Sequence, residues 1–474
     1  MSTTPQRKSF QERLDIFVHK LREDILNGLY PPGSFLPPEI KLAEQHQLSN
    51  KSVRKGLDTL VDEGLIVKIN RVGNKVTGTG SKEKIVLTLG CSPSIERDFA
   101  LQQLLADFHA QFPTIQVNTV TLSPGHPTAG KHFINTFKNY LENGIVDVLT
   151  LNPMYFGEFV DSNCLELLDP LSPQPEFYPF LNRAFTYQDN LYVQPIVFSP
   201  LVLCYNKEHF RKTGLPEPDS SWEWDDVVRS AEELAIPGRR HGLYFHLLSE
   251  NRWPLFMLQS GMSFRAANDG EGEECELEGT KLLDNIRRVK QLVNNRRIFP
   301  GYLVESNDDV NQLFLEDRVS IIFSSYMNMS EFKHTNIQFD VAPIPYSDCP
   351  ATLMIIVGLA VNANSQNKHA ANLLLRYFAS RRAQQKIREL TLSIPACKPI
   401  AEQAGQDNKS LNRPPHFAMF REHLRPSRVQ RDLGLSDVHF YTLRSLLKKY
   451  WSDMIDEETL CREVRQQLHG YVLQ

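Results

Sequence analysis

The sequence predicts an α/β protein whose small N-terminal domain consists of helices and a hairpin. Residues 36–76 show the apolar pattern of two short helices, a tight turn and two short strands. From residue 84 onward apolar strands alternate with helices, which indicates βαβ units and a parallel sheet. Residues 1–84 hold 14 Lys and Arg against 10 Asp and Glu, whereas the rest hold 38 against 46. This asymmetry indicates that only the N-terminal domain meets a polyanion.

The segment from residue 36 to residue 76 reads as helix, turn, helix and wing. Its first helix begins after two prolines, which suit a first helical turn, and Ser49 is a suitable N-cap for the second helix. Gly64 is placed as a glycine that ends this second helix. One stripe of the second helix is expected to be buried, and it consists of Val53, Leu57, Leu60 and Val61.

The other face of the second helix carries polar and basic side chains near its N-terminal end. Such a face fits the major groove of DNA, and a basic hairpin tip fits the neighbouring phosphates or the minor groove. The alternative is a small helical domain with a solvated basic face. The residues expected to contact DNA are Glu39, Ser49, Asn50, Lys51, Ser52, Arg54, Lys55, Arg71, Gly73 and Lys75.

This segment resembles the winged helix-turn-helix of GntR-family transcription regulators. The resemblance rests on Leu36, Pro37, Glu39, Leu42, Ala43, Ser49, Val53, Arg54, Leu57, Leu60, Gly64, Leu65, Ile66, Val67 and Gly73. Two positions where the family favours arginine hold Ile40 and Asn50 instead. Since both positions commonly contact DNA in the family, the operator sequence does not carry over.

The domain boundaries follow from composition. An amphipathic helix is expected over 11–26, before the DNA-reading unit. A polar, glycine-bearing stretch at 79–84 reads as a linker. The expected domains are therefore 1–78, a winged helix-turn-helix that we call the head, and 85–474, an effector domain that we call the body.

The alternation of strands and helices in the first half of the body predicts a ligand crevice. Strands are expected at 84–90, 115–122 and 146–151, and helices at 99–112 and 133–142. Ligands of open α/β sheets sit at the carboxyl ends of strands. The residues that this rule places around one crevice are Cys91, Ser92, Ser94, Asn152 and Met154.

The stretch 185–205 reads as a hairpin followed by a long apolar run with two prolines. Proline in a strand pattern indicates a bend or an edge, and such a segment can leave one lobe and enter another. Later strands are expected at 319–323, 339–344 and 354–361. Later helices are expected at 221–234, 253–259, 281–294, 370–390 and in the tail from residue 436, which should pack back on the body.

The body resembles the type 1 extracellular solute-binding proteins of ABC importers, which bind sugars. The motifs that carry the resemblance are Ile85–Leu89, Phe108, Phe112, Pro113, Ile115, Val117, Asp147-Val148, Leu191-Tyr192, Pro195, Tyr205-Asn206-Lys207, Phe210, Gly214-Leu215-Pro216, Trp224-Asp225, Ala342–Pro345, Gly358-Leu359-Ala360 and Ile394-Pro395-Ala396. The resemblance implies a two-lobed, periplasmic-binding-protein-like (type II) domain with a hinge and a ligand cleft.

A sugar cleft needs flat aromatic rings and polar side chains, because sugars present apolar ring faces and hydroxyl edges. Trp253 and Tyr326 are the expected stacking residues, although both types also occur in cores. The polar and crossover residues expected at the ligand are Ser92, Glu96, Asn152, Phe198 and Ser199. Trp224, at a helix start, is expected to pack in the core.

The sequence shows no pattern of a metal, cofactor or catalytic site. The 14 histidines have no ligand spacing, and the seven cysteines are scattered without a CxxC pair. We therefore expect no cofactor, no enzyme activity and no disulfide framework. No apolar run reaches membrane length and no apolar signal core stands at the N-terminus, so we expect a cytoplasmic protein without a membrane partner.

The preferred interpretation is a DNA-binding regulator whose body senses a small molecule, a sugar or oligosaccharide. A homodimer is expected because symmetric operators require paired heads. One alternative is an aminotransferase-like body with pyridoxal phosphate, as occurs in other GntR proteins, but its nearest serine–lysine spacing is Ser445 to Lys448. The other alternative is an interaction platform without a ligand.

Overall fold

The computed structural model describes residues 10–26, 29–70, 72–77, 84–122, 133–267, 275–300, 306–403, 409–425 and 427–474. The chain forms two compact units, one of residues 1–86 with 106–116 and one of residues 87–105 with 117–474. The proposed linker at 79–84 lies outside the described residues except for Lys84, so this boundary stays a prediction. Among the described residues no helix is both long and apolar enough to cross a membrane.

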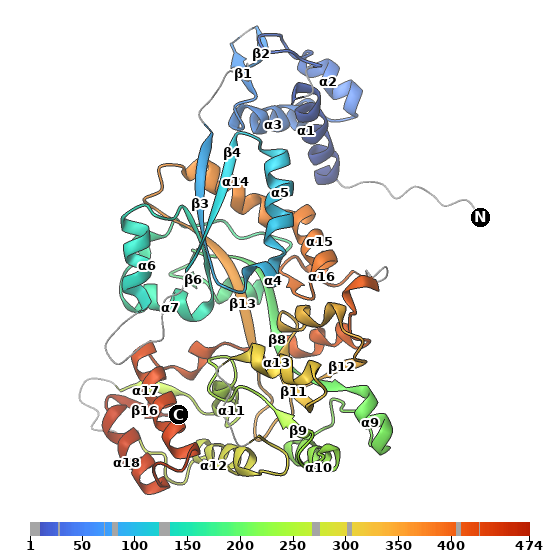
Figure 1. Ribbon diagram of the computed structural model, residues 1–474. Coiled ribbons are helices and arrows are strands. Elements are labelled where there is room, and N and C mark those ends of the chain that lie inside the picture. The colour runs from blue at the N-terminus through green and yellow to red at the C-terminus, as the bar shows by residue number, and fades with distance from the viewer. Residues whose placement is uncertain are drawn as a thin grey trace. The chain divides into compact units, whose positions relative to one another are not determined.

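The N-terminal head has the predicted order of helix, turn, helix and wing (Figure 1). Its elements are α1 (Phe10–Leu26), α2 (Glu39–His46), α3 (Asn50–Asp62), β1 (Ile66–Ile69) and β2 (Gly73–Val76). Ser49 caps α3, since its hydroxyl oxygen accepts a hydrogen bond from the backbone N–H of Ser52 at 3.1 Å. Gly64 follows α3 at a φ of +70°, which suits glycine. Both end signals are therefore confirmed.

The head is held together by close packing of α1 on α3. Gly56 of α3 faces Phe17 of α1, and a Cβ at Gly56 would lie 2.6 Å from a ring carbon of Phe17. A buried ion pair joins the same two segments, with Nε of Arg22 2.8 Å from Oε2 of Glu63. The predicted stripe is buried through Val53, Leu57 and Leu60. The orientation of α3 on α1 therefore depends on the close approach at Gly56, where no side chain fits, and on the ion pair between Arg22 and Glu63.

A ten-stranded sheet runs through the body in the order β4-β3-β5-β13-β8-β11-β9. Its strands are β3 (Ile85–Cys91), β4 (Ile115–Thr121), β5 (Val148–Leu151), β8 (Gln194–Asn206), β9 (His241–Tyr244), β11 (Val319–Ser325) and β13 (Thr352–Val361), with β12 (Phe339–Ala342) and β14 (Ile394–Pro395) on β8 and β15 (Ser427–Arg428) on β13. The expected parallel pairing holds for β3 with β5 and for β9 with β11. The sheet is nevertheless mixed, because β8 pairs antiparallel with β11 and β13, and β13 pairs antiparallel with β5.

Two groups of elements form the lobes of the body. The first lobe contains β3, β4 and β5 with α4 (Ile95–Phe99), α5 (Leu101–Gln111), α6 (Phe133–Glu142) and α7 (Pro153–Asp161). The second lobe contains β9, β11 and β12 with α9 (Lys207–Thr213), α10 (Trp224–Leu234), α11 (Trp253–Leu258), α12 (Lys281–Asn294), α13 (Asn307–Leu315) and η2 (Asn328–His334). The tail, with α17 (Asp437–Trp451), α18 (Glu457–Gln467) and β16 (Tyr471–Leu473), packs back as predicted, since β16 pairs with β10 (Phe264–Ala266).

Strands β8 and β13 pass from one lobe to the other (Figure 1). The first half of β8 pairs with β13, and its second half pairs with β11. The crossover inferred from the two prolines is thus present, but the edge placement is wrong because β8 is a central strand. The register shifts between Val357 and Gly358, opposite Pro195. This irregularity accommodates a residue that has no N–H to donate to the ladder.

One predicted helix is interrupted, and another begins two residues later than expected. The helix expected over 370–390 is split into α14 (Lys368–Ala379) and α15 (Arg381–Leu390), because Ser380 is extended and caps α15. The helix expected over 99–112 is preceded by α4 and separated from it by Ala100 at a φ of +53°. At both Ala100 and Ser380 the backbone leaves the right-handed helical conformation, although the helical spacing of apolar residues continues across each position.

We predict that Gly56→Val loosens the head. The valine side chain would collide with Phe17, and overpacking of this kind costs about 1–3 kcal/mol. Hydrogen exchange of the α1 and α3 amides should become faster, while the amides of β8 keep their protection. The matched control is Lys55→Val, which introduces the same side chain at an exposed position of α3. Equal exchange in both variants would contradict the packing of α1 on α3.

Candidate functional site

The exposed face of α3 is the candidate nucleic-acid interface. Asn50, Lys51, Arg54 and Lys55 are all exposed along the first turns of this helix. The Arg54 side chain is 67% exposed, and its Nε lies 2.6 Å from Oε2 of Glu39 on α2. This contact orients the guanidinium group while leaving it accessible to a partner.

Not all residues predicted to contact DNA are exposed in the structure. Ser52 is buried, and its hydroxyl group lies 2.6 Å from that of Ser49, so both serines shape the start of α3. The expectation of a DNA contact at Ser52 is therefore corrected. On the wing Gly73 is exposed and Lys75 is half-buried, whereas Arg71 lies outside the described residues. An ion pair between Lys68 and Asp58 joins the wing to α3.

The body contains a cavity of about 180 Å³ with walls from both lobes. The first lobe contributes Ser92, Ser94, Arg97, Asp98, Thr150, Asn152 and Tyr155. The second lobe contributes Asn251, Arg252, Asn307, Ser325, Met327 and Asn328. Leu151 and Pro153 of the first lobe, residues 354–357 of β13 and Gln430 complete the wall. Most of these groups are hydrogen-bonding groups, which suits a ligand rich in hydroxyls.

Three of the residues placed at strand ends, Ser92, Ser94 and Asn152, line this cavity. The backbone N–H of Ser92 donates to the Thr150 hydroxyl at 2.8 Å, which joins the ends of β3 and β5. The Oδ1 atom of Asn152 caps α7 by accepting from the N–H of Tyr155 at 2.8 Å. The carboxyl ends of β3 and β5 therefore form part of the cavity wall, as expected for the ligand crevice of an open α/β sheet.

The other residues at strand ends lie elsewhere. Cys91 and Met154 are buried in the core and do not line the cavity. Glu96 is exposed, and its Oε2 accepts from the N–H of Gln102 at 3.0 Å, outside the cavity wall.

The predicted aromatic platforms are core residues in this structure. Trp253 is fully buried, with its ring centroid 4.5 Å from that of Phe440. Tyr326 is also fully buried and stands edge-on to Phe417 at 5.0 Å. Neither ring lines the cavity, so stacking on a ligand is corrected to packing. Trp224 packs in the core as expected.

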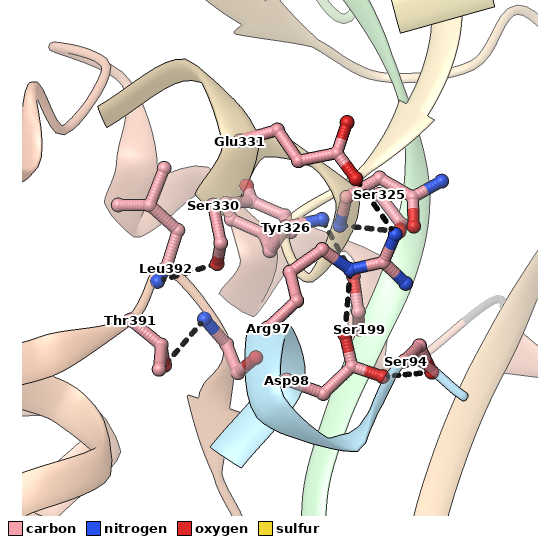
Figure 2. A network of polar contacts seen from close by, with 12 residues as sticks. Ser94, Arg97, Asp98, Ser199, Ser325, Tyr326, Ser330, Glu331, Thr391 and Leu392 are labelled. Carbon is pink, nitrogen blue, oxygen red and sulfur yellow. Dashed lines mark hydrogen bonds and ion pairs between the residues drawn. The ribbon is translucent and has the colours of Figure 1, made fainter. Parts of the chain in front are cut away.

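The crossover residues Phe198 and Ser199 are buried as well. Phe198 contacts the ring of Tyr178 edge-to-face at 5.3 Å. The Ser199 hydroxyl accepts from the N–H of Tyr326 at 2.7 Å (Figure 2). Ser199 therefore ties β8 to the end of β11 and does not reach the cavity.

Arg97 forms a bridge between the lobes at the cavity (Figure 2). Its Nε lies 2.9 Å from Oδ1 of Asp98, which also accepts from the Ser94 hydroxyl at 2.7 Å. Its Nη1 lies 3.0 Å from Oε1 of Glu331 and 3.5 Å from Oδ1 of Asp308, both in the second lobe. These contacts hold the two walls together, and the sequence carried no signal for them.

A cluster of carboxyl groups lies behind the wall that α7 forms. Glu158 of α7 and Asp437 of α17 are near enough to share a hydrogen bond once one of them is protonated. Burial raises the pKa of both carboxyls, and their mutual repulsion raises that of Glu158 further. Arg431 pairs with the nearby Asp161 at 2.9 Å. The Glu158–Asp437 pair therefore retains a proton that ordinary carboxyls would release.

We predict that the contribution of the Glu158–Asp437 pair to stability is lost as the pH rises from about 5 to about 9. Glu158 and Asp437 have ordinary pKa values of 4.5 and 3.8, and folding raises both, so the folded state binds more protons. Their stabilising contribution is thus complete at low pH and is lost on the alkaline side. Glu158→Gln should flatten the decline in unfolding midpoint with pH, whereas Glu166→Gln, at an exposed site, should not. An unchanged slope in Glu158→Gln would exclude the shared proton.

Comparison with known proteins agrees with both parts of the structure. Residues 92–385 match the bacterial extracellular solute-binding protein family, and residues 17–76 match the gntR family of bacterial regulatory proteins. The HTH-type transcriptional regulator YieP of Escherichia coli is 36% identical over 77 residues, which cover 16% of this chain and 34% of that regulator. The Multiple sugar-binding protein of Streptococcus mutans is 21% identical over 346 residues, covering 69% of this chain and 79% of that protein.

The body also resembles solved structures. The ABC substrate-binding protein Lmo0181 from Listeria monocytogenes, in complex with cycloalternan, superposes with a TM-score of 0.65 at 18% identity. The superposition covers 81% of this chain and 98% of that protein, which establishes the two-lobed fold. The chain belongs to the bacterial extracellular solute-binding protein family and carries a GntR-type winged helix-turn-helix at its N-terminal end.

Proposed function

We propose that this protein is a cytoplasmic transcription regulator that senses a small sugar. The head would bind an operator through the exposed face of α3, and the body would bind the sugar in the cavity between its lobes. The observation that carries the proposal is the accessible Arg54 guanidinium on a GntR-type recognition helix, in the same chain as a solute-binding cavity.

The geometry of α3 supports a role in groove recognition. Arg54 stands beside Asn50 and Lys51 at the N-terminal end of the helix, which is the end that helix-turn-helix proteins present to base edges. The contact with Glu39 restrains the guanidinium before DNA arrives, so less rotamer entropy is lost on binding. We propose that Lys55, which is exposed, and Lys75, which is half-buried, contact phosphates, and Arg71 stays a predicted contact.

The proposed coupling uses the hinge between the lobes. Arg97 joins the walls through Asp308 and Glu331, so a ligand that fits only the joined walls would favour the closed state. Such a ligand can change DNA affinity only if open and closed proteins bind DNA differently. A homodimer, in which closure alters the spacing of two heads, is the arrangement that we propose for this coupling.

The alternatives are weaker. An aminotransferase-like body does not fit, because residues 92–385 match a solute-binding family. A ligand-free interaction platform does not account for a polar cavity lined from both lobes.

We predict that Arg54→Ala weakens binding to an operator selected from random DNA duplexes by about tenfold or more. A well-placed arginine–base contact is worth about 1–3 kcal/mol, and this variant removes it. A gel-shift titration of the full chain measures the effect. Arg13→Ala, which removes an exposed arginine of α1, is the matched control and should bind almost normally. Equal affinities for the two variants would show that α3 is not the reading helix.

We predict further that a sugar which raises the unfolding temperature of the chain also changes its affinity for the selected operator. The physical reason is linkage, because one ligand that favours the closed state shifts every equilibrium that depends on closure. Fluorescence anisotropy of labelled operator, with and without saturating sugar, measures the change. Identical affinities would refute sensing while leaving the DNA-binding role intact.

A further inference from the structure

The second-lobe wall of the cavity contains a fully buried arginine. Arg252 precedes α11, and none of its side chain is exposed to solvent. Its Nη1 donates to the carbonyl of Asn251 at 3.0 Å, and its Nη2 donates to the carbonyl of Phe323 at 3.3 Å. Its Nε has no hydrogen-bond partner within the described part of the chain. A guanidinium has five N–H donors, so this group is incompletely bonded.

The charge of Arg252 is also uncompensated. Burial alone lowers the pKa of Arg252 to about 9, and no carboxylate among the described residues counters this shift. In the described residues its polar partners are backbone carbonyls. Buried arginines are normally paired, because an isolated buried charge loses much of its solvation.

The opposite wall shows the contrast. Arg97 also lines the cavity, but it is surrounded by the carboxylates of Asp98, Asp308 and Glu331. Asp98 is in turn bonded to Ser94 and Arg97. These three carboxylates are therefore engaged with Arg97, and in the described residues none of them pairs with Arg252.

Two further buried atoms of the cavity wall have no partner in the part of the chain described. They are the hydroxyl oxygen of Ser92 and Oδ1 of Asn307, from opposite lobes. A hydroxyl can donate or accept, and an amide oxygen accepts, so both suit the hydroxyl groups of a sugar. The cavity volume of about 180 Å³ is below the range of drug-sized pockets, which favours a single sugar unit over a chain.

We propose that the cavity takes a small sugar that carries an anionic group, a carboxylate or a phosphate, and that Arg252 binds this group. The free donors of the guanidinium match the planar pair of oxygens of a carboxylate or two oxygens of a phosphate. The hydroxyls of the same sugar are bound by Ser92 and Asn307. This inference rests on the proposed function, because it names the ligand class of the same cavity.

Arg252 is buried and its Nε has no partner within the described residues, an arrangement that is expected to cost stability. Replacing a buried charge by an apolar side chain of similar length is often neutral or stabilising. Arg252→Met is therefore expected to leave the unfolding temperature of the ligand-free chain unchanged or higher. Binding of the anionic sugar should be lost in the same variant.

The test measures binding to the full chain by calorimetry and by thermal unfolding. The probes are D-galacturonate, D-glucuronate and D-glucose 6-phosphate, each compared with its neutral parent, D-galactose or D-glucose. We expect at least one anionic probe to bind about tenfold or more tighter than its parent, as a charge-assisted hydrogen bond provides. The uronates and the phosphate form separate arms and so distinguish the two anions.

Arg252→Met should reduce the affinity for the anionic probe to that for the neutral parent. Arg252→Lys, which keeps the charge but not the planar fork, should bind with intermediate affinity. The matched control is Arg444→Met, because Arg444 also donates to a backbone carbonyl, that of Leu248 at 2.7 Å, but does not line the cavity. This control should bind as the unaltered chain does.

The inference is overturned if no anionic probe binds, if neutral parents bind equally well, or if Arg252→Met and Arg252→Lys both keep the preference for the anion. Failure of the proposed function is a different result. In that case the anionic probe binds through Arg252, but operator affinity measured with the same samples does not change.

Discussion

The antiparallel pairing of β8 with β13 is the constraint on which the body depends. Both strands serve both lobes, so their register decides which residues of the lobes face each other. The register shift at Gly358 accommodates Pro195, and a side chain at Gly358 would lie 2.6 Å from the carbonyl oxygen of Gln194. The cavity wall includes residues 354–357 of β13 next to this shift. Hinge and cavity are thus built from the same backbone.

Electrostatics divides the cavity into two unlike walls. The charge of Arg97 is compensated by carboxylates from both lobes. If the contact with Glu331 of the second lobe were broken, Arg97 would still be paired with Asp98 of its own lobe. Arg252 is fixed in the core with carbonyl partners and a charge that nothing in the described chain neutralises. Behind the first wall, burial raises the pKa of both Glu158 and Asp437, and the repulsion between the two carboxylates raises that of Glu158 further, so this pair favours a protonated state. Buried charged and protonated groups are therefore concentrated around the cavity.

Much of the head and part of the cavity could be predicted from the sequence. The N-cap at Ser49 and the terminal glycine Gly64 act within a few residues, so their signals are local and were read correctly. Ser92 and Asn152 were found because strand ends of a parallel sheet meet at one edge. The expectation that Trp253 stacks on a ligand is wrong, because an aromatic ring suits a sugar platform and a hydrophobic core equally well, and only packing distinguishes the two.

The sequence by itself determined the order of the elements, the exposed basic face of α3 and the alternation that makes an α/β body, because these depend on spacing between near neighbours. Only the tertiary structure decided the composition of the cavity. Arg97 meets Glu331 across 234 positions, and Ser92 meets Thr150 across 58. Whether an arginine such as Arg252 finds a counter-charge is likewise a property of the folded chain. Burial and pairing arise from contacts between distant segments, and no local pattern encodes them.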